Sequence, residues 1–246
     1  MGTDYFDPAY FDPAYFDTTG SWVDVNTEND DLRTQVTTSV EYGIRGNTPS
    51  DRVANAGVLK FALDNSQKNS AQRMGYYSLL RGDKAPGFNL NVPVRMRLWC
   101  AQVASGQHYY KFLGKLDEAI PDPGIFGPRM TACTAVDIFD DYANIDEPDL
   151  PLQVNKRYDE IITSILAGLT TQPRAQTIET GSEPYTYALD GGSTERPERS
   201  KVRERFIQLA ASEFGYVYVK GDTTGGGTLV AENRHHRIIA DRKSVV

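Results

Sequence analysis

The chain has 246 residues, of which 39% are hydrophobic and 24% charged, a composition typical of a globular protein with one or two domains. It has no run of about 18 apolar residues, and its first residues lack a basic and then apolar leader, so we expect neither a membrane span nor a secretory signal. The formal net charge of −7 argues against nucleic-acid binding, which needs a basic surface to neutralise phosphates.

The chain begins with three copies of Tyr-Phe-Asp, at 5–7, 10–12 and 15–17, joined by Pro-Ala. The prolines recur too closely for a helix and bias the residues before them towards extended backbone, so we predict an extended arm over residues 1–19. Because so short an arm cannot bury its own rings, we expect them to pack on a neighbouring subunit. The predicted interface residues are Tyr5, Phe6, Tyr10, Phe11, Tyr15 and Phe16. The alternative is a disordered N-terminus.

A β-rich segment follows the arm. Alternating and β-branched stretches predict strands at 22–26, 34–44, 57–65, 92–103, 108–116 and 129–139. In the stretch 92–103, the apolar face is predicted to hold Val92, Val94, Met96, Leu98 and Cys100, and the opposite face Arg95, Arg97 and Trp99. Residues 105–107 can turn the chain, so this strand and the next form a predicted hairpin. An acidic corner at 140–149 ends the segment.

Helical spacing then replaces alternation. Apolar residues recur on one face of 155–169, with Asn155 as the expected N-cap. After a Gly/Pro/Ser-rich stretch at 171–200, a second amphipathic helix is predicted within 197–215. Its apolar stripe is Val202, Phe206, Leu209, Ala210 and Phe214, with Gly215 at the C′ position. Residues 216–234 predict a hairpin with a glycine-rich turn. The fold class is therefore mainly β with two amphipathic helices, α+β.

Acidic residues cluster at the end of the predicted β segment, at Asp137, Asp140, Asp141 and Asp146. A calcium loop of the EF-hand type needs oxygen ligands at alternate positions and a glycine at the sixth. The spacing does not match, so we interpret the cluster as a solvated corner between domains.

Histidine and cysteine give no stronger signal for a metal. His235 and His236 are adjacent, and adjacent residues of a strand point to opposite faces, so they are poorly placed to chelate one ion. Cys100 and Cys133 lack CxxC spacing, and we interpret them as small buried side chains rather than a disulfide. We predict no metal and no cofactor.

The sequence contains no GxSxG, HExxH or P-loop motif, and we predict no enzymatic activity. Glu118 and Asp122 have the side chains of a glycosidase pair, but 33 acidic residues make such pairs common by coincidence. The stretch GDTTGGGT at 221–228 lacks the lysine and the following helix of a phosphate loop, so a hairpin turn explains it better.

Several stretches, in their order along residues 20–238, resemble a known family. They are VEYGIRGNTPSDRVANAGVLKFALDNS, the pair NVPVRMRL and HYYKFLGKL, RMTACTAVDIFDDYA, and FGYVYVKGDTTGGGTLVAENRH. They resemble minor tail or tail-tip hub proteins of siphovirus-like bacteriophages, which are similar to the baseplate hub of contractile tails. The chain stops soon after its last predicted hairpin, so we expect a longer relative or a partner to supply a further element.

The resemblance implies a β-barrel-like domain over 20–145 and a smaller α+β domain over 150–246. It also implies a structural virion protein of the phage tail, made in the bacterial host cytoplasm, that forms a ring linking the tail tube to the adsorption apparatus. The expected partners are copies of itself, most simply as a homotrimer, and neighbouring tail tube or distal tail proteins. A tape measure protein is a further candidate.

Two other functions remain open from the sequence. The first is a carbohydrate-binding β module that recognises a host surface by stacking sugars on aromatic rings. Its platforms would be Trp22, Trp99, Tyr109 and Tyr110. The second is a cell-wall hydrolase, which the acidic pairs alone support.

Overall fold

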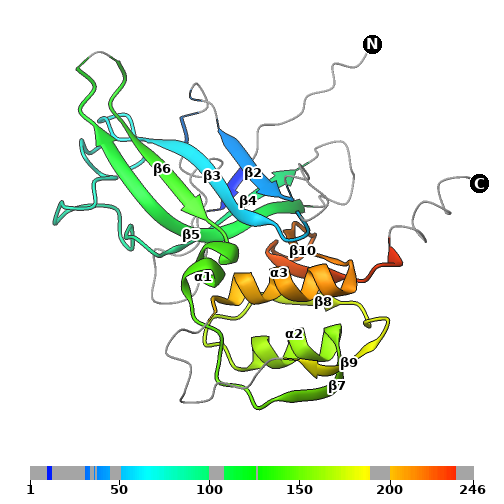
Figure 1. The fold of residues 1–246 in the computed structure, drawn as a ribbon. Helices are drawn as coiled ribbons and strands as arrows, with labels where there is room; N and C mark the ends of the chain where they lie inside the picture. The colour runs from blue at the N-terminus through cyan, green and yellow to red at the C-terminus, as the bar shows by residue number, and fades with distance from the viewer. Residues whose placement is uncertain are drawn as a thin grey trace, which may run out of the picture. The chain divides into compact units, whose positions relative to one another are not determined.

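The computed structural model describes residues 10–12, 31–33, 36, 38–44, 51–99, 108–125, 127–188 and 200–236. The chain forms two compact units (Figure 1). The first takes its residues from 1–41, 57–137 and 221–227, and the second from 42–56, 138–220 and 228–246. Each unit is built from stretches that are separated in the sequence.

The first unit is built on a six-stranded sheet with the order β1-β4-β5-β6-β3-β2. Its strands are β1 (Tyr10–Asp12), β2 (Ser39–Gly43), β3 (Asn55–Asp64), β4 (Pro93–Trp99), β5 (His108–Asp122) and β6 (Met130–Val136). The predicted central hairpin is confirmed as the antiparallel pair β4–β5. In its described part the sheet has two different edge strands, β1 and β2. It is therefore open, which differs from the predicted barrel-like form.

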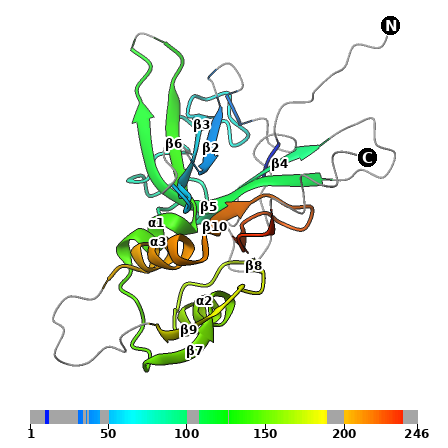
Figure 2. The same ribbon diagram turned by 45° about the vertical axis from the view of Figure 1, so that its right-hand side comes forward.

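The core of the first unit follows from strand alternation. Leu59, Phe61 and Leu63 of β3 are buried, and so are Val94 and Met96 of β4, as the alternation of that strand predicts. They pack with apolar side chains from β5, β6 and the connection between β3 and β4. Figure 2 shows β5 and β6 running side by side to their connecting turn.

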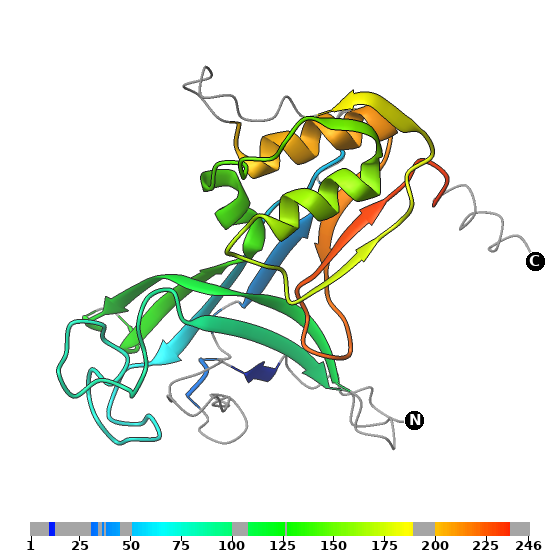
Figure 3. The ribbon, with the colours of Figure 1, turned by 90° about the horizontal axis from the view of Figure 1, so that it is seen from below.

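The second unit combines three helices with two small sheets. The helices are α1 (Ile138–Asn144), α2 (Tyr158–Ala167) and α3 (Val202–Glu213). One sheet has the order β10-β11-β8, from β10 (Tyr216–Lys220), β11 (Thr228–Glu232) and β8 (Ala175–Ile178); the other pairs β7 (Gln153–Arg157) with β9 (Pro184–Ala188). Helices α2 and α3 lie side by side (Figure 3). The predicted hairpin at 216–234 is confirmed as β10–β11.

The core of the second unit is formed by the apolar faces of the helices and by β11, whose five residues are all buried. Aromatic rings meet edge-on within it: the Tyr142 ring centroid lies 6.0 Å from that of Phe139 and 5.7 Å from that of Phe206. None of the described helices is long and apolar enough to cross a membrane.

The number of helices differs from the sequence prediction, because the described residues form three where two were expected. The predicted strand 129–139 ends at Val136, and α1 occupies part of the predicted acidic corner. Phe139 and Tyr142 are three residues apart, so a helix places both on its buried face, whereas a strand would not.

The first predicted helix begins later than its apolar pattern suggested. Asn155 is not its N-cap but lies in β7 with a φ of +51°. The helix starts at Tyr158, where the Glu160 carboxylate accepts the Arg157 N–H at 2.9 Å. This hydrogen bond is the main cause that holds the pKa of Glu160 below its usual value, and the neighbouring Lys156 is the second. The prediction failed because β7 leads directly into the helix.

The end of α3 also differs from the prediction. Phe214, and not Gly215, takes the left-handed conformation, with a φ of +57°, and its ring is exposed rather than part of the apolar stripe. The Gly215 N–H bonds to the Ala210 carbonyl at 3.0 Å, which completes a Schellman motif. Gly215 is required for another reason: a Cβ there would lie 2.2 Å from the Glu232 carbonyl oxygen.

Candidate functional site

The middle copy of the N-terminal repeat forms β1 at one edge of the first unit's sheet. Tyr10 lies opposite Arg97 of β4, and Phe11 lies opposite Met96. The other four predicted interface residues, at positions 5, 6, 15 and 16, lie outside the described residues. The role of the six aromatic residues in assembly therefore stays a prediction.

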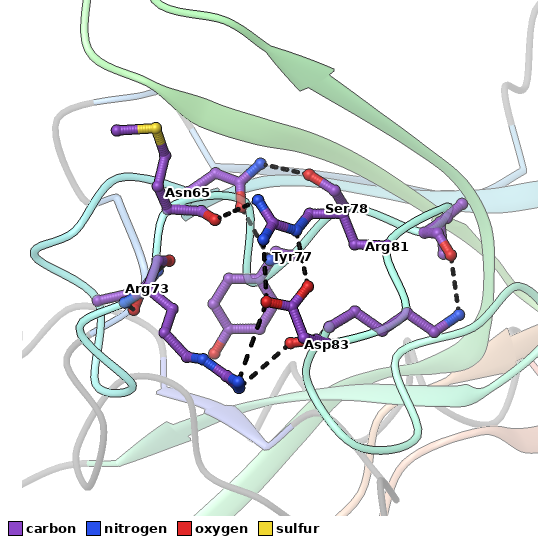
Figure 4. Close-up of polar contacts among 10 residues, drawn as sticks. Asn65, Arg73, Tyr77, Ser78, Arg81 and Asp83 are labelled. Atoms are coloured by element: carbon purple, nitrogen blue, oxygen red, sulfur yellow. Dashed lines mark hydrogen bonds and ion pairs between the residues drawn. The ribbon is translucent and has the colours of Figure 1, made fainter.

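The connection between β3 and β4, residues 65–92, is here called the β3–β4 loop. It contains no described helix or strand, and side-chain hydrogen bonds hold it in place (Figure 4). At its base Asp31 is fully buried and accepts bonds from the Ser70 N–H and hydroxyl, both at 2.6 Å, and from the Tyr77 hydroxyl. Burial, and then the bond to Asp31, raises the pKa of Tyr77.

Two asparagines extend this network. The Asn65 amide accepts the Tyr77 N–H at 2.8 Å and donates to the Ser78 hydroxyl at 2.9 Å. The Asn69 side chain bridges the turn by donating to the Arg73 carbonyl at 2.7 Å and accepting its N–H at 3.0 Å. Because the polar side chains bind main-chain groups, the loop has a defined conformation without regular structure.

The outer part of the β3–β4 loop is fixed by an ion pair. Arg81 donates to both carboxylate oxygens of Asp83, at 2.8 and 2.9 Å, and to the Met74 carbonyl at 2.8 Å. Arg73 lies 3.9 Å from the same carboxylate (Figure 4). The bond from Arg81 holds the pKa of Asp83 below its usual value. This arrangement leaves the neighbouring Leu80 completely exposed, at 101%.

The glycine-rich turn at 221–227 packs on β5 within the first unit. Asp222 and Tyr110 exchange two main-chain hydrogen bonds, at 2.7 and 3.0 Å. The Asp222 carboxylate accepts the N–H groups of Thr224, Gly225 and Gly226 at 2.7 to 3.0 Å. Since a carboxylate of the chain already occupies these donors, the turn has a structural role and the phosphate-loop alternative is not favoured.

The aromatic platforms of the carbohydrate alternative are also engaged within the chain. The Tyr109 hydroxyl donates to the Gly221 carbonyl at 2.8 Å, and the Arg95 guanidinium lies 4.8 Å from the centre of the Tyr110 ring. Trp22 lies outside the described residues, and the side chain of Trp99 is not described. Of the four predicted platforms, Tyr109 and Tyr110 are the two whose side chains are described, and both make contacts within the chain.

A buried polar cluster lies in the second unit, at the end of α3. Glu213 is fully buried, accepts the Ser182 N–H at 3.1 Å, and lies 3.5 Å from the Arg234 Nε. Among the described residues its second oxygen has no hydrogen-bond partner, and neither do the hydroxyls of Tyr158 and Tyr185. Burial, and then the charge of Glu213, raises the pKa of both phenols, that of Tyr185 to about 12. The cluster thus keeps two phenols neutral and provides no nucleophile.

His236 contacts two carboxylates near this cluster. Its Nδ1 bonds to Glu179, and its Nε2 lies 3.4 Å from Glu232. The Asn233 N–H also donates to Glu179, at 3.0 Å. The side chain of His235 takes no part in these contacts, so the structure does not place His235 and His236 around one metal ion.

The acidic residues from the sequence are dispersed. Asp137 is buried, Asp140 and Asp141 lie in the first turn of α1, and Asp146 pairs with Lys201 at 2.6 Å. Within the described ranges no group of three or more His, Cys, Asp or Glu side chains is arranged to hold a metal ion. Cys133 is a buried free thiol, and burial raises its pKa. Cys100 lies outside the described residues.

No protein-family model matches the chain, and no curated protein matches it. Solved structures do. The 43 kDa tail protein of prophage MuSo2 from Shewanella oneidensis has a TM-score of 0.49 and 12% identity, over 91% of this chain and 54% of that one. The tail protein from Neisseria meningitidis MC58 has a TM-score of 0.49 and 12% identity, over 91% and 50%.

A third similar structure is the c3393 protein of E. coli, described as a component of the type VI secretion system with similarity to T4 bacteriophage tail proteins. It has a TM-score of 0.43 and 9% identity, over 78% of this chain and 49% of that one. These three structures are described as tail proteins or as similar to tail proteins, the class of protein that the sequence stretches resemble. The chain spans about half the length of the tail proteins that it matches.

Sequence reasoning missed the residues that give the β3–β4 loop its form. The stretch DNSQKNS shows only a polar break after a strand, and nothing local connects it to Asp31 or Tyr77. The signal that was available is the run of Gly82, Asp83, Pro86 and Gly87, because these residue types favour turns. The sequence also places an apolar residue, Leu80, just before this run.

Proposed function

We propose that this chain is a structural component of a phage-type tail, in the tail tip or hub, and not an enzyme. The resemblance of its sequence stretches to tail hub proteins supports this role. The contacts of His236 with Glu179 and of Glu213 with Ser182 also fit this role, because these side chains bind other parts of the chain.

The proposed mechanism is geometric. Copies of the chain associate around the tail axis as a ring, most simply a homotrimer, and the ring joins the tail tube to the adsorption apparatus. Neighbouring tube or distal tail proteins complete the assembly, and a tape measure protein is a further candidate partner. A closed ring is favoured because it satisfies sheet edges that are exposed on a single copy.

One observation carries the proposal: in the described part of the chain, the first unit's sheet is open and one of its edges is partly covered. Strand β4 extends from Pro93 to Trp99, and among the described residues β1 pairs with three of them, at positions 95–97. At the other edge β2 is five residues long. The N–H and C=O groups along an unpaired stretch of an edge strand can take main-chain hydrogen bonds from another chain.

The carbohydrate-binding module remains the alternative. The observation that weighs against it is that a cation already lies over each ring, Lys111 over Tyr109 and Arg95 over Tyr110.

The test is the mass of the purified full chain in solution, by light scattering after size exclusion, together with labelling of the protein in intact particles viewed by electron microscopy. We expect a discrete oligomer and label at the tail tip. A monomer that binds glycans on an array, with label absent from the tail, would contradict the proposal.

A further inference from the structure

Two surface segments at the same end of the first unit's sheet carry opposite charge. The β3–β4 loop holds four basic residues, Lys68, Arg73, Arg81 and Lys84, and one acidic residue, Asp83. The turn between β5 and β6 with its flanks, residues 117–128, is here called the β5–β6 tip, and it holds Asp117, Glu118 and Asp122 and no basic residue. In a chain with a net charge of −7, the loop is a local basic surface.

Their common location follows from the register of the sheet. Asp64, the last residue of β3, lies opposite Met130, the first residue of β6. The Asn65 N–H bonds to the Arg129 carbonyl at 3.2 Å, just outside the tip. The loop therefore leaves the sheet where the tip ends.

Both segments expose large apolar side chains. Leu80 of the loop is 101% exposed, and Ile120 and Ile125 of the tip are 55% and 74% exposed. Single exposed apolar residues are ordinary on a protein surface. These three differ because they stand beside charges of opposite sign on two neighbouring segments.

Both segments are also fixed in place. The Arg81 contacts to Asp83 and to Met74 hold the loop next to Leu80. In the tip, the Asp122 carboxylate accepts the Gly124 N–H at 2.8 Å, and Gly124 has a φ of +71°. A surface that is already ordered loses less conformational entropy when it binds.

Strand pairing leaves the tip accessible as well. β4 pairs with β5 only as far as Lys115, whereas β5 continues to Asp122. One edge of β5 pairs with β4 up to Lys115. Along the tip, that same edge of β5 is not paired with β4. Asp117, Glu118 and Ile120 are all exposed there.

We propose that the β3–β4 loop of one copy docks on the β5–β6 tip of a second copy of this chain. Leu80 packs against Ile120 and Ile125, and the basic side chains of the loop face Asp117 and Glu118. The occupant is a second copy because the matching charge and the matching apolar residues occur in the same chain. The inference rests on the self-association proposed above and names the surfaces that carry it.

The first test is disulfide trapping between copies. Leu80→Cys and Ile125→Cys are made separately in a Cys100→Ser background with different tags, and the buried Cys133 is kept. The two proteins are mixed and oxidised mildly, and mixed-tag dimers are read on a non-reducing gel. The control is Tyr187→Cys, a residue that is 71% exposed on β9 of the second unit. A disulfide requires Cα atoms within about 7 Å.

We expect the Leu80→Cys and Ile125→Cys pair to form mixed dimers several-fold faster than either forms with Tyr187→Cys. Equal rates for all pairs would overturn the proposed contact. Because the two cysteines are on separate chains, contact within one copy cannot produce the signal.

The second test reverses the charges. Lys68→Glu with Arg73→Glu, and separately Asp117→Lys with Glu118→Lys, should each reduce self-association, and mixing the two variants should restore it, as measured by sedimentation velocity. All four side chains are exposed, so the fold should persist, which a melting curve checks. A wild-type chain that stays monomeric contradicts the self-association itself. A wild type that associates, with variants that associate equally well, contradicts only this contact.

Discussion

At the scale of single residues, the most consequential side chain in the first unit is Asp31. It is fully buried and accepts two hydrogen bonds from Ser70 and one from Tyr77. Because hydrogen bonds to a charged group contribute more than neutral ones, we expect Asp31→Asn to lower the free energy of unfolding by about 2 kcal/mol. Urea denaturation checks this. Asp83→Asn, at an exposed ion pair, should cost much less, and an equal loss for both variants would contradict the role assigned to Asp31.

Gly215 is the second residue with a sharp expectation. A methyl group there would meet the Glu232 carbonyl oxygen, so Gly215→Ala should destabilise the protein by about 2 kcal/mol, the usual cost of overpacking. The matched control is Gly82→Ala, where nothing lies within 4 Å of the added Cβ and φ is not positive. It should leave the melting temperature unchanged or slightly raised. Similar losses at both positions would refute this account.

At the scale of elements, the N-terminal arm contributes little to the described fold. β1 covers three residues of β4, so we expect deletion of residues 1–17 to leave the far-ultraviolet circular dichroism spectrum nearly unchanged while it weakens incorporation into the tail. The measurement compares the melting curve of the truncated chain with its yield in assembled particles. Normal incorporation of the truncated chain would show that the arm is not an assembly element.

The same scale shows what the sequence could predict. Strands with a clear alternation, such as β4, and helices with a broad apolar stripe, such as α3, were predictable because their buried faces follow one local period. β8 and β9 were missed within a stretch read as Gly/Pro/Ser-rich, because they are short and have few buried residues. The β3–β4 loop was missed because the bonds of Asp31 join residues 39 and 46 positions apart, which no local pattern reveals.

At the scale of the whole molecule, buried tyrosine side chains make the stability of the fold decrease at alkaline pH. Burial raises the pKa of Tyr77, Tyr142 and Tyr158, and that of Tyr185 to about 12. The folded chain therefore favours the neutral phenols, and it loses stability as pH rises above the usual phenol pKa of about 10, where the unfolded chain ionises.

We expect the urea midpoint to fall between pH of about 9 and 11. Tyr158→Phe removes a buried hydroxyl that has no hydrogen-bond partner among the described residues, so it should reduce this fall without lowering stability at neutral pH. A urea midpoint that stays constant over this pH range would contradict the prediction.

The turn at 221–227 has a practical consequence for anyone who dissects this chain. Asp222 supplies main-chain bonds to Tyr110 from more than a hundred positions away, so a gene fragment that stops at residue 137 deletes the partner of a strand it retains. In such a fragment, backbone N–H and C=O groups of β5 would lack their hydrogen-bond partners, and the fragment would tend to precipitate. Circular permutation, which keeps every stretch of the polypeptide, is the safer way to cut and rejoin it.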